Sequence, residues 1–229
     1  MNRVVNIFTF IVLIVFFLMV MTVVFDLSVS QFHLKGMKYK QEVFTSIAIL
    51  VFLLGLIRVQ RRYQGIKDMK KYTKFQFAVP VSDKHRNYGF VICLIEAGFM
   101  IAGIGACFLF IKLEPAYVIP MMVVLSLLAL ESIVFGFTLK KGGVAFRLGF
   151  DDSVIAAFDR EMNLFYYEGL KKVDLHQNDL ISFSYIDDLD LPLQTAIIDQ
   201  KDRKAFRDAL VTKLEAKNIY VGDSLRNWQ

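Results

Sequence analysis

Two glutamates inside apolar stretches are the residues best placed to do chemistry. Glu96 lies in the apolar run 88–111, and Glu131 lies in the run 116–139. Counted from the polar ends of these runs, each carboxylate is roughly 12–14 Å deep along a helix that rises 1.5 Å per residue. The matching depths predict that a tight antiparallel pair of helices would bring both carboxylates to one level.

Carboxylates in such surroundings are costly to hold, so they need a role or a partner. Two at one level could share a proton, bind a cation or meet a polar group of another protein. No basic residue lies within either run. Three interpretations stay open: protonated glutamates that hydrogen-bond across a bundle, a proton or cation pathway, and a contact with a partner subunit.

The elements that must position these glutamates are long apolar helices. The chain has 229 residues, of which 55% are hydrophobic, and this excess is concentrated in its first 141 residues. A charge-poor stretch of about 20 residues can cross a bilayer as a helix. The sequence predicts a four-helix transmembrane domain over 1–141, with spans at about 4–25, 43–58, 88–111 and 116–139.

The first run also admits a different interpretation, a signal peptide. Arg3 would be its basic start, and Ser28-Val29-Ser30 would be a loose cleavage site. The apolar run of 22 residues is longer than the apolar core of a usual signal peptide. A transmembrane span is therefore the favoured interpretation.

The distribution of Lys and Arg predicts the orientation of the spans. Residues 1–141 carry 16 Lys/Arg and 7 Asp/Glu, whereas residues 142–229 carry 11 and 15. The connection 58–87 holds nine of the basic residues, against three in 26–42 and one in 112–114. By the positive-inside rule, that connection and both termini face the cytoplasm of a multi-pass protein in the cytoplasmic (inner) membrane.

Within the connection 58–87, basic residues alternate with aromatic ones, as at Lys74-Phe75-Gln76-Phe77. This mixture suits a membrane interface, where it could hold anionic lipid. It could instead dock acidic segments such as Asp187-Asp188-Leu189-Asp190, or serve only as a topology signal. Basic residues beside membrane spans give no reason to expect a nucleic-acid partner. The candidate patch comprises Arg58, Arg61, Arg62, Lys67, Lys70, Lys71 and Lys74.

The remaining residues, 142–229, alternate between apolar and polar side chains and predict a small cytoplasmic α+β domain. The clearest pattern is Ile181-Ser182-Phe183-Ser184-Tyr185, which has one apolar and one polar face. Segment 201–217 switches to helical spacing, and 219–229 could add a short edge segment anchored by Trp228. Six strands are predicted, at 144–150, 153–158, 164–168, 171–175, 180–186 and 193–199.

This order of elements, antiparallel strands closed by a C-terminal helix and joined directly to transmembrane helices, resembles the bacterial PH-like domains found on small membrane proteins. The resemblance covers about 144–217 and depends on patterns such as Leu180-Ile181-Ser182-Phe183 and Phe206–Leu214. It implies a binding or scaffolding module with no catalytic site. A complete PH fold has about seven strands, one more than the sequence predicts. The hairpin Phe150–Asn163 has no basic phosphoinositide-binding signature, which favours a protein partner.

Signatures of catalysis or cofactor binding are missing from the sequence. The histidines His33, His85 and His176 do not face one another across spans, as a haem would require. No Cys/His cluster has metal-ligand spacing, and no nucleotide-binding loop is present. Cys93 and Cys107 lie roughly 21 Å apart along one helix, too far to bond. We therefore expect no enzyme, no cofactor and no metal.

Two functions remain as expectations. The first is a non-enzymatic accessory or scaffold subunit of a membrane protein complex, with membrane lipids and other membrane protein subunits as partners. The second is a small proton- or cation-coupled transporter in which Glu96 and Glu131 carry the ion.

Overall fold

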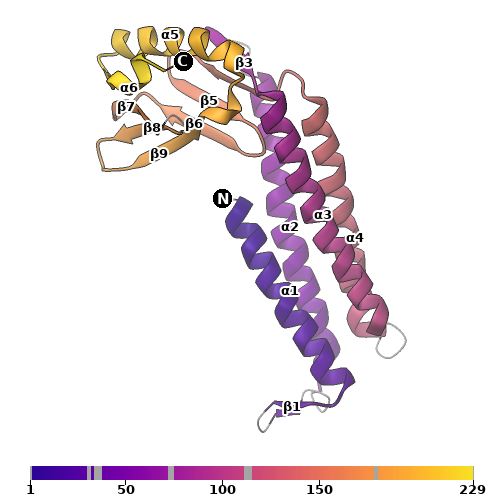
Figure 1. Cartoon of the computed structure of the whole chain (residues 1–229). Coiled ribbons are helices and arrows are strands. Elements are labelled where there is room, and N and C mark those ends of the chain that lie inside the picture. The colour runs from indigo at the N-terminus through magenta and orange to yellow at the C-terminus, as the bar shows by residue number, and fades with distance from the viewer. Residues whose placement is uncertain are drawn as a thin grey trace. The chain divides into compact units, whose positions relative to one another are not determined.

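Four long helices dominate the structure, a computed structural model that describes residues 2–29, 32–33, 38–71, 75–110, 115–177 and 180–228. Each is long and apolar enough to cross a membrane, which indicates a membrane protein. They are labelled in Figure 1. Their bounds are α1 Asn2–Val24, α2 Lys40–Lys71, α3 Asp83–Phe110 and α4 Pro115–Lys141.

The second helix is longer than the apolar run that predicts it. Its segment 59–71, expected as part of a loop, continues as helix because Arg, Gln and Lys are good helix formers. The turn expected at 112–114 lies outside the described residues, as does Lys74. Between α1 and α2, a small hairpin pairs β1 (Ser28–Val29) with β2 (Phe32–His33).

Contacts divide the chain into two compact units. The helical unit comprises Met1–Arg61 and Val91–Gly136, and the sheet unit comprises Arg62–Phe90 and Phe137–Gln229. Helices α2, α3 and α4 contribute residues to both. Each unit has its own cluster of buried apolar side chains.

Within the helical unit, buried positions recur at alternating spacings of three and four residues. In α2 this stripe runs through Phe44, Ala48, Val51, Gly55 and Arg58. The same spacing recurs in α1 and α4 and is typical of helices packed nearly parallel in a bundle. The outward faces of the helices carry exposed Ile, Leu, Val and Phe side chains, as expected for helices that face lipid.

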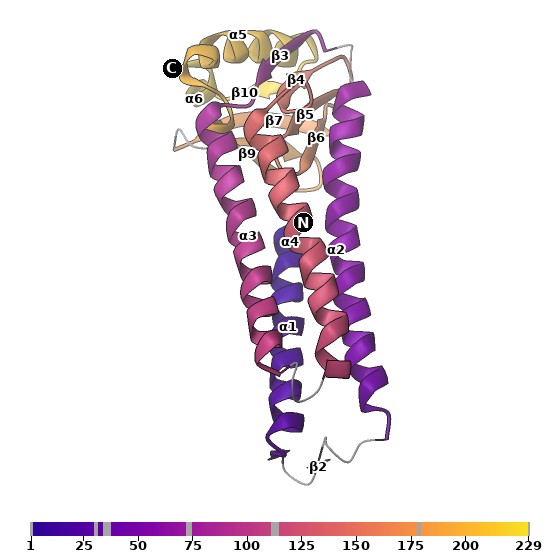
Figure 2. The same cartoon turned by 90° about the vertical axis from the view of Figure 1, so that its right-hand side faces the viewer.

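The sheet unit contains two four-stranded sheets. Most of their strands are labelled in Figure 2, and β8 is labelled in Figure 1. One has the order β3-β4-β5-β6 and is antiparallel throughout. The other has the order β10-β7-β8-β9 and is antiparallel except for β10, which pairs parallel with β7. The strands are β3 Phe77–Pro80, β4 Arg147–Phe150, β5 Val154–Phe158, β6 Met162–Tyr166, β7 Leu170–His176, β8 Leu180–Tyr185, β9 Asp190–Gln194 and β10 Tyr220–Val221.

Strand β3 is one of the elements that the sequence did not predict. It pairs with β4 along its whole length, from Phe77 opposite Phe150 to Pro80 opposite Arg147. Helices α3 and α4 lie between these two strands in the chain. The first sheet therefore begins before the third long helix and resumes after the fourth.

The last predicted strand also differs from the structure. Strand β9 occupies Asp190–Gln194, whereas the sequence predicts 193–199. A tight turn sets the register, with Asp188 at a φ of 54° and Ser184 opposite Asp190. The residues that follow form a 3-10 helix, η2, at Thr195–Ile197.

The C-terminal elements cover the apolar core of the sheets. Helix α5 (Gln200–Ala216) buries Phe206, Leu210 and Leu214, a stripe with helical spacing. After β10, the short helix α6 (Asp223–Arg226) leads to Trp228, which is 3% exposed. The expected edge segment and its aromatic anchor are thus both present.

Side chains of the sheet unit fasten the ends of three long helices. Arg147 Nη2 on β4 donates to the carbonyl of Met69 near the end of α2, at 3.0 Å. Ser82 caps the start of α3 and donates to the carbonyl of Ala196, at 2.6 Å. Arg86 Nη1 donates to the carbonyl of Lys140 at the end of α4, at 3.4 Å. The strands and these helix ends therefore form one compact unit.

Candidate functional site

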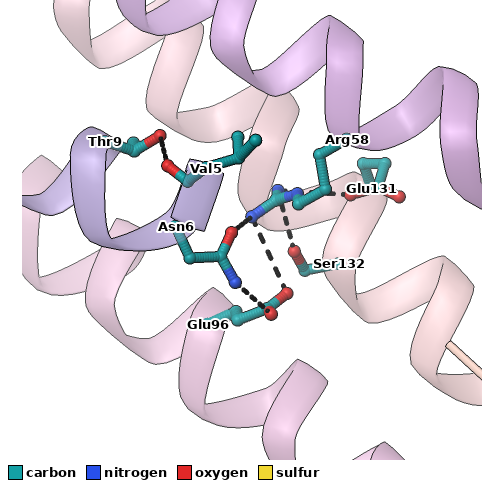
Figure 3. A network of polar contacts seen from close by, with 7 residues as sticks. All are labelled: Val5, Asn6, Thr9, Arg58, Glu96, Glu131 and Ser132. Carbon is teal, nitrogen blue, oxygen red and sulfur yellow. Dashed lines mark hydrogen bonds and ion pairs between the residues drawn. The ribbon is translucent and has the colours of Figure 1, made fainter. Parts of the chain in front are cut away.

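The candidate site is a polar network inside the helical unit, centred on Arg58 of α2 (Figure 3). Its Nη2 lies 3.3 Å from Glu131 Oε2 and donates to Ser132 Oγ at 3.1 Å, both on α4. Its Nη1 lies 3.7 Å from Glu96 Oε2 on α3. One guanidinium therefore connects both glutamates, and three helices meet at this side chain.

Asn6 adds the fourth helix, α1, to the network. Its Nδ2 donates to Glu96 Oε1 at 2.7 Å, and its Oδ1 lies 3.4 Å from Arg58 Nη1. The amide thus uses its donor toward a carboxylate and its acceptor toward a guanidinium. One turn later, Thr9 satisfies its hydroxyl within α1 by donating to the carbonyl of Val5 (Figure 3).

The helical register explains why these side chains meet. Arg58 follows Gly55 by three residues on the buried stripe of α2, and Ser132 follows Leu128 by four on the buried stripe of α4. Gly55 itself leaves room for Leu128: a Cβ there would lie 2.2 Å from a methyl carbon of that side chain. Close approach of α2 and α4 therefore brings Arg58 to the level of Glu131.

The network is shielded from solvent, so its charges depend on one another. The side chains of Arg58, Glu96 and Glu131 are 3%, 13% and 10% exposed. Charge separations of 3.3–3.7 Å are long for hydrogen bonds, so Coulomb attraction is the larger component. A buried charge that loses its partner is strongly destabilising, and each member of the network therefore constrains the others.

The structure brings together the two predicted carboxylates but divides the predicted basic patch. Arg58 and Arg62 are buried, at 2% and 1% exposure. Arg61 is half-buried. Lys67, Lys70 and Lys71 are exposed, and Lys74 lies outside the described residues. The seven residues thus do not form one surface.

The sequence does not predict three members of the network as partners of the glutamates: Asn6, Arg58 and Ser132. A signal for Arg58 existed, because it continues the three-four spacing of Phe44, Ala48, Val51 and Gly55. The sequence gives a weaker indication for Asn6, because a single amide in an apolar helix does not show which residue it contacts. Cys93 and Cys107 are buried in α3, as small apolar packing residues are.

A second largely buried polar contact, between a histidine and an aspartate, lies in the sheet unit. His85 Nε2 of α3 is 2.8 Å from Asp159 Oδ2, in the turn between β5 and β6. Burial raises the pKa of the Asp159 carboxyl, but hydrogen bonds from His85 and from the backbone N–H of Arg160 outweigh it, so the pKa lies below its usual value. The pair joins the first turn of α3 to the strands.

The polar network can hold the four helices in register, because its hydrogen bonds and ion pairs join side chains from all of them. Within the described ranges, no group of three or more His, Cys, Asp or Glu residues could hold a metal ion. Comparisons of the chain with protein-family models, with curated proteins and with solved structures find no match.

Proposed function

We propose that this chain is a non-enzymatic accessory or scaffold subunit of a protein complex in the cytoplasmic membrane. Four transmembrane helices would anchor it, with both termini and the sheet unit in the cytoplasm. The sheet unit would bind a protein partner, and the helices would contact membrane lipids and other membrane subunits.

The attachment of the ends of α2, α3 and α4 within the sheet unit is the observation that carries this proposal. A strand before the α3–α4 pair and a strand after it are neighbours in one sheet. Three helix ends are hydrogen-bonded to side chains of the same unit. A domain attached in this way presents its surface at a fixed position relative to those helix ends, which suits a scaffold better than a domain on a flexible linker.

The strand arrangement supports a PH-like sheet unit. Strands β3–β6 form one antiparallel group, β7–β9 form a second, and α5 follows them. Strand β3 raises the number of strands before the helix from six to seven, which is about the number in a complete PH fold. Such folds usually hold lipids, peptides or proteins, which supports a binding role.

The alternative, a proton- or cation-coupled transporter, keeps one favourable observation: Glu96 and Glu131 face the same point. The guanidinium at that point argues against it. Arg58 keeps its positive charge and would compete with a transported cation for both carboxylates. The contacts therefore favour a structural role for the pair.

Affinity purification of the tagged full-length protein from mild detergent tests the proposal. We expect one or more membrane proteins to co-purify in constant proportion. A lone monomer without a stable companion would contradict it. Reporter fusions at the C-terminus test the orientation, and an exterior location would contradict cytoplasmic binding.

Ion flux in liposomes separates the two functions. If the chain is a transporter, the wild-type protein should show ion flux that falls in Glu96→Gln and Glu131→Gln. If it is an accessory subunit, neither the wild-type protein nor the variants should show flux. A flux that depends on either glutamate would favour the transporter.

A further inference from the structure

Six exposed lysines gather at the ends of α2, α3 and α4 that belong to the sheet unit. In the described part of the chain, none of the six forms an ion pair with a carboxylate. They are Lys67, Lys70, Lys71, Lys84, Lys140 and Lys141. Six exposed cations without carboxylate partners, at three neighbouring helix ends, form a positively charged surface that would attract an anionic ligand.

Each of these helix ends also carries an exposed aromatic side chain about one turn closer to its apolar span. On α2, Tyr63 precedes Lys67 by four residues, and on α3, Tyr88 follows Lys84 by four. On α4, Phe137 lies just before the two terminal lysines. Tyr63, Tyr88 and Phe137 are 41%, 57% and 57% exposed. The same order, apolar span, aromatic residue and then lysine, thus occurs three times.

Helical spacing separates the lysines from the buried face of α2. Tyr63, Lys67, Lys70 and Lys71 follow the spacing of one helical face, and all four are exposed. On the opposite face, Gly65 lies against Phe158 of β5: a Cβ there would be 2.3 Å from the ring. The lysines of α2 therefore point away from the strands and are accessible to a ligand.

We propose that these helix ends bind the head groups of anionic phospholipids, an inference that rests on the proposed membrane crossing of α2, α3 and α4. Aromatic side chains concentrate at the level of lipid head groups, and lysines just beyond them are attracted to negatively charged lipid. The repeated order of aromatic and lysine on three helices fits this layering. A soluble polyanion would account for the lysines but not for the aromatic side chains one turn closer to the span.

Spin-labelled lipids test the proposal on the full-length protein in phosphatidylcholine bilayers. Electron spin resonance measures the fraction of labelled phosphatidylglycerol or phosphatidylcholine whose motion the protein restricts, and the ratio gives the lipid preference. We expect the wild-type protein to prefer phosphatidylglycerol. The variant Lys67→Gln/Lys70→Gln/Lys71→Gln should lower this preference at low salt by about fivefold, the factor that corresponds to about 1 kcal/mol of attraction.

The matched control removes three exposed lysines from the strands and α5: Lys171→Gln/Lys201→Gln/Lys204→Gln. It changes the net charge by the same amount and should keep the wild-type preference. Equal association of both lipids with the wild-type protein would overturn the proposal. It would also be overturned if the control variant lost as much of the preference for phosphatidylglycerol as the variant of α2 does. Resistance to extraction by alkaline carbonate, measured in parallel, tests the membrane crossing itself. If the protein resists extraction but shows no lipid preference, this inference is refuted and the proposed membrane crossing is not.

Discussion

Replacing Arg58 by methionine should destabilise the helical unit more than any other single change in the polar network. With an effective dielectric constant of about 20, separations of 3.3 and 3.7 Å correspond to attractions of about 5 and 4.5 kcal/mol before desolvation is counted. Desolvation cancels part of this, but removing one partner of a buried pair leaves charge without compensation. We expect Arg58→Met to lower the free energy of unfolding by about 3 kcal/mol.

The triple variant Arg58→Met/Glu96→Gln/Glu131→Gln distinguishes a mutual charge dependence from simple loss of packing. Removing all three charges together avoids the uncompensated state, so the triple variant should regain most of the lost stability. Unfolding in mixed detergent micelles, followed by circular dichroism, measures both variants against the wild-type protein. A loss of less than about 0.5 kcal/mol in Arg58→Met, or a triple variant that is less stable than Arg58→Met, would refute the mutual dependence of these charges.

Three further outcomes are expected from the contacts described. Asn6→Leu removes the amide that joins α1 to the network and should cost about 0.5–2 kcal/mol in the same unfolding assay, so an unchanged transition would show that the amide contributes nothing. Gly65→Ala should destabilise the protein by about 1–3 kcal/mol, because the new Cβ would meet the ring of Phe158. Gly98→Ala should cause no loss of stability, because no atom lies within 4 Å of its Cβ position. Similar unfolding midpoints for the two variants would contradict this prediction. The pKa of Asp159 is lower in the folded protein than in the unfolded chain, where it is about 3.9. The ionised carboxylate therefore stabilises the fold above about pH 3.9, and this stabilisation is lost as the pH falls through the folded-state pKa. Between about pH 5 and pH 3 the wild-type protein should therefore lose more stability than Asp159→Asn, and parallel pH profiles would contradict this.

The long helices could be predicted because each run carries its own evidence. Apolar length alone marks a candidate span, and an antiparallel pair of helices at 88–111 and 116–139 places Glu96 and Glu131 at one level. The structure brings both to the same guanidinium. The sequence alone therefore predicts that two polar residues at equal depth in adjacent helices lie close together.

Arg58 and β3 show where such prediction ends. The count of Lys and Arg that predicts the basic patch treats all cations alike. In the structure, Arg58 continues the buried stripe of α2 and is buried, whereas Lys67 lies off that stripe and is exposed. Strand β3 has only four residues, one of them Pro80, and its partner β4 lies beyond two long helices. Pairing between such distant segments depends on the folded arrangement of α3 and α4, which no local pattern records.

The position of β3 has a consequence for biosynthesis. At 5–20 residues per second, a ribosome needs roughly 3–13 s to make residues 81–146, which separate β3 from β4. During that time β3 exists without its neighbour in the sheet, and its hydrogen-bonding edge is available to chaperones and to other nascent chains. The first sheet can close only after the entire α3–α4 segment has been translated, so completion of this sheet marks the completion of both helices.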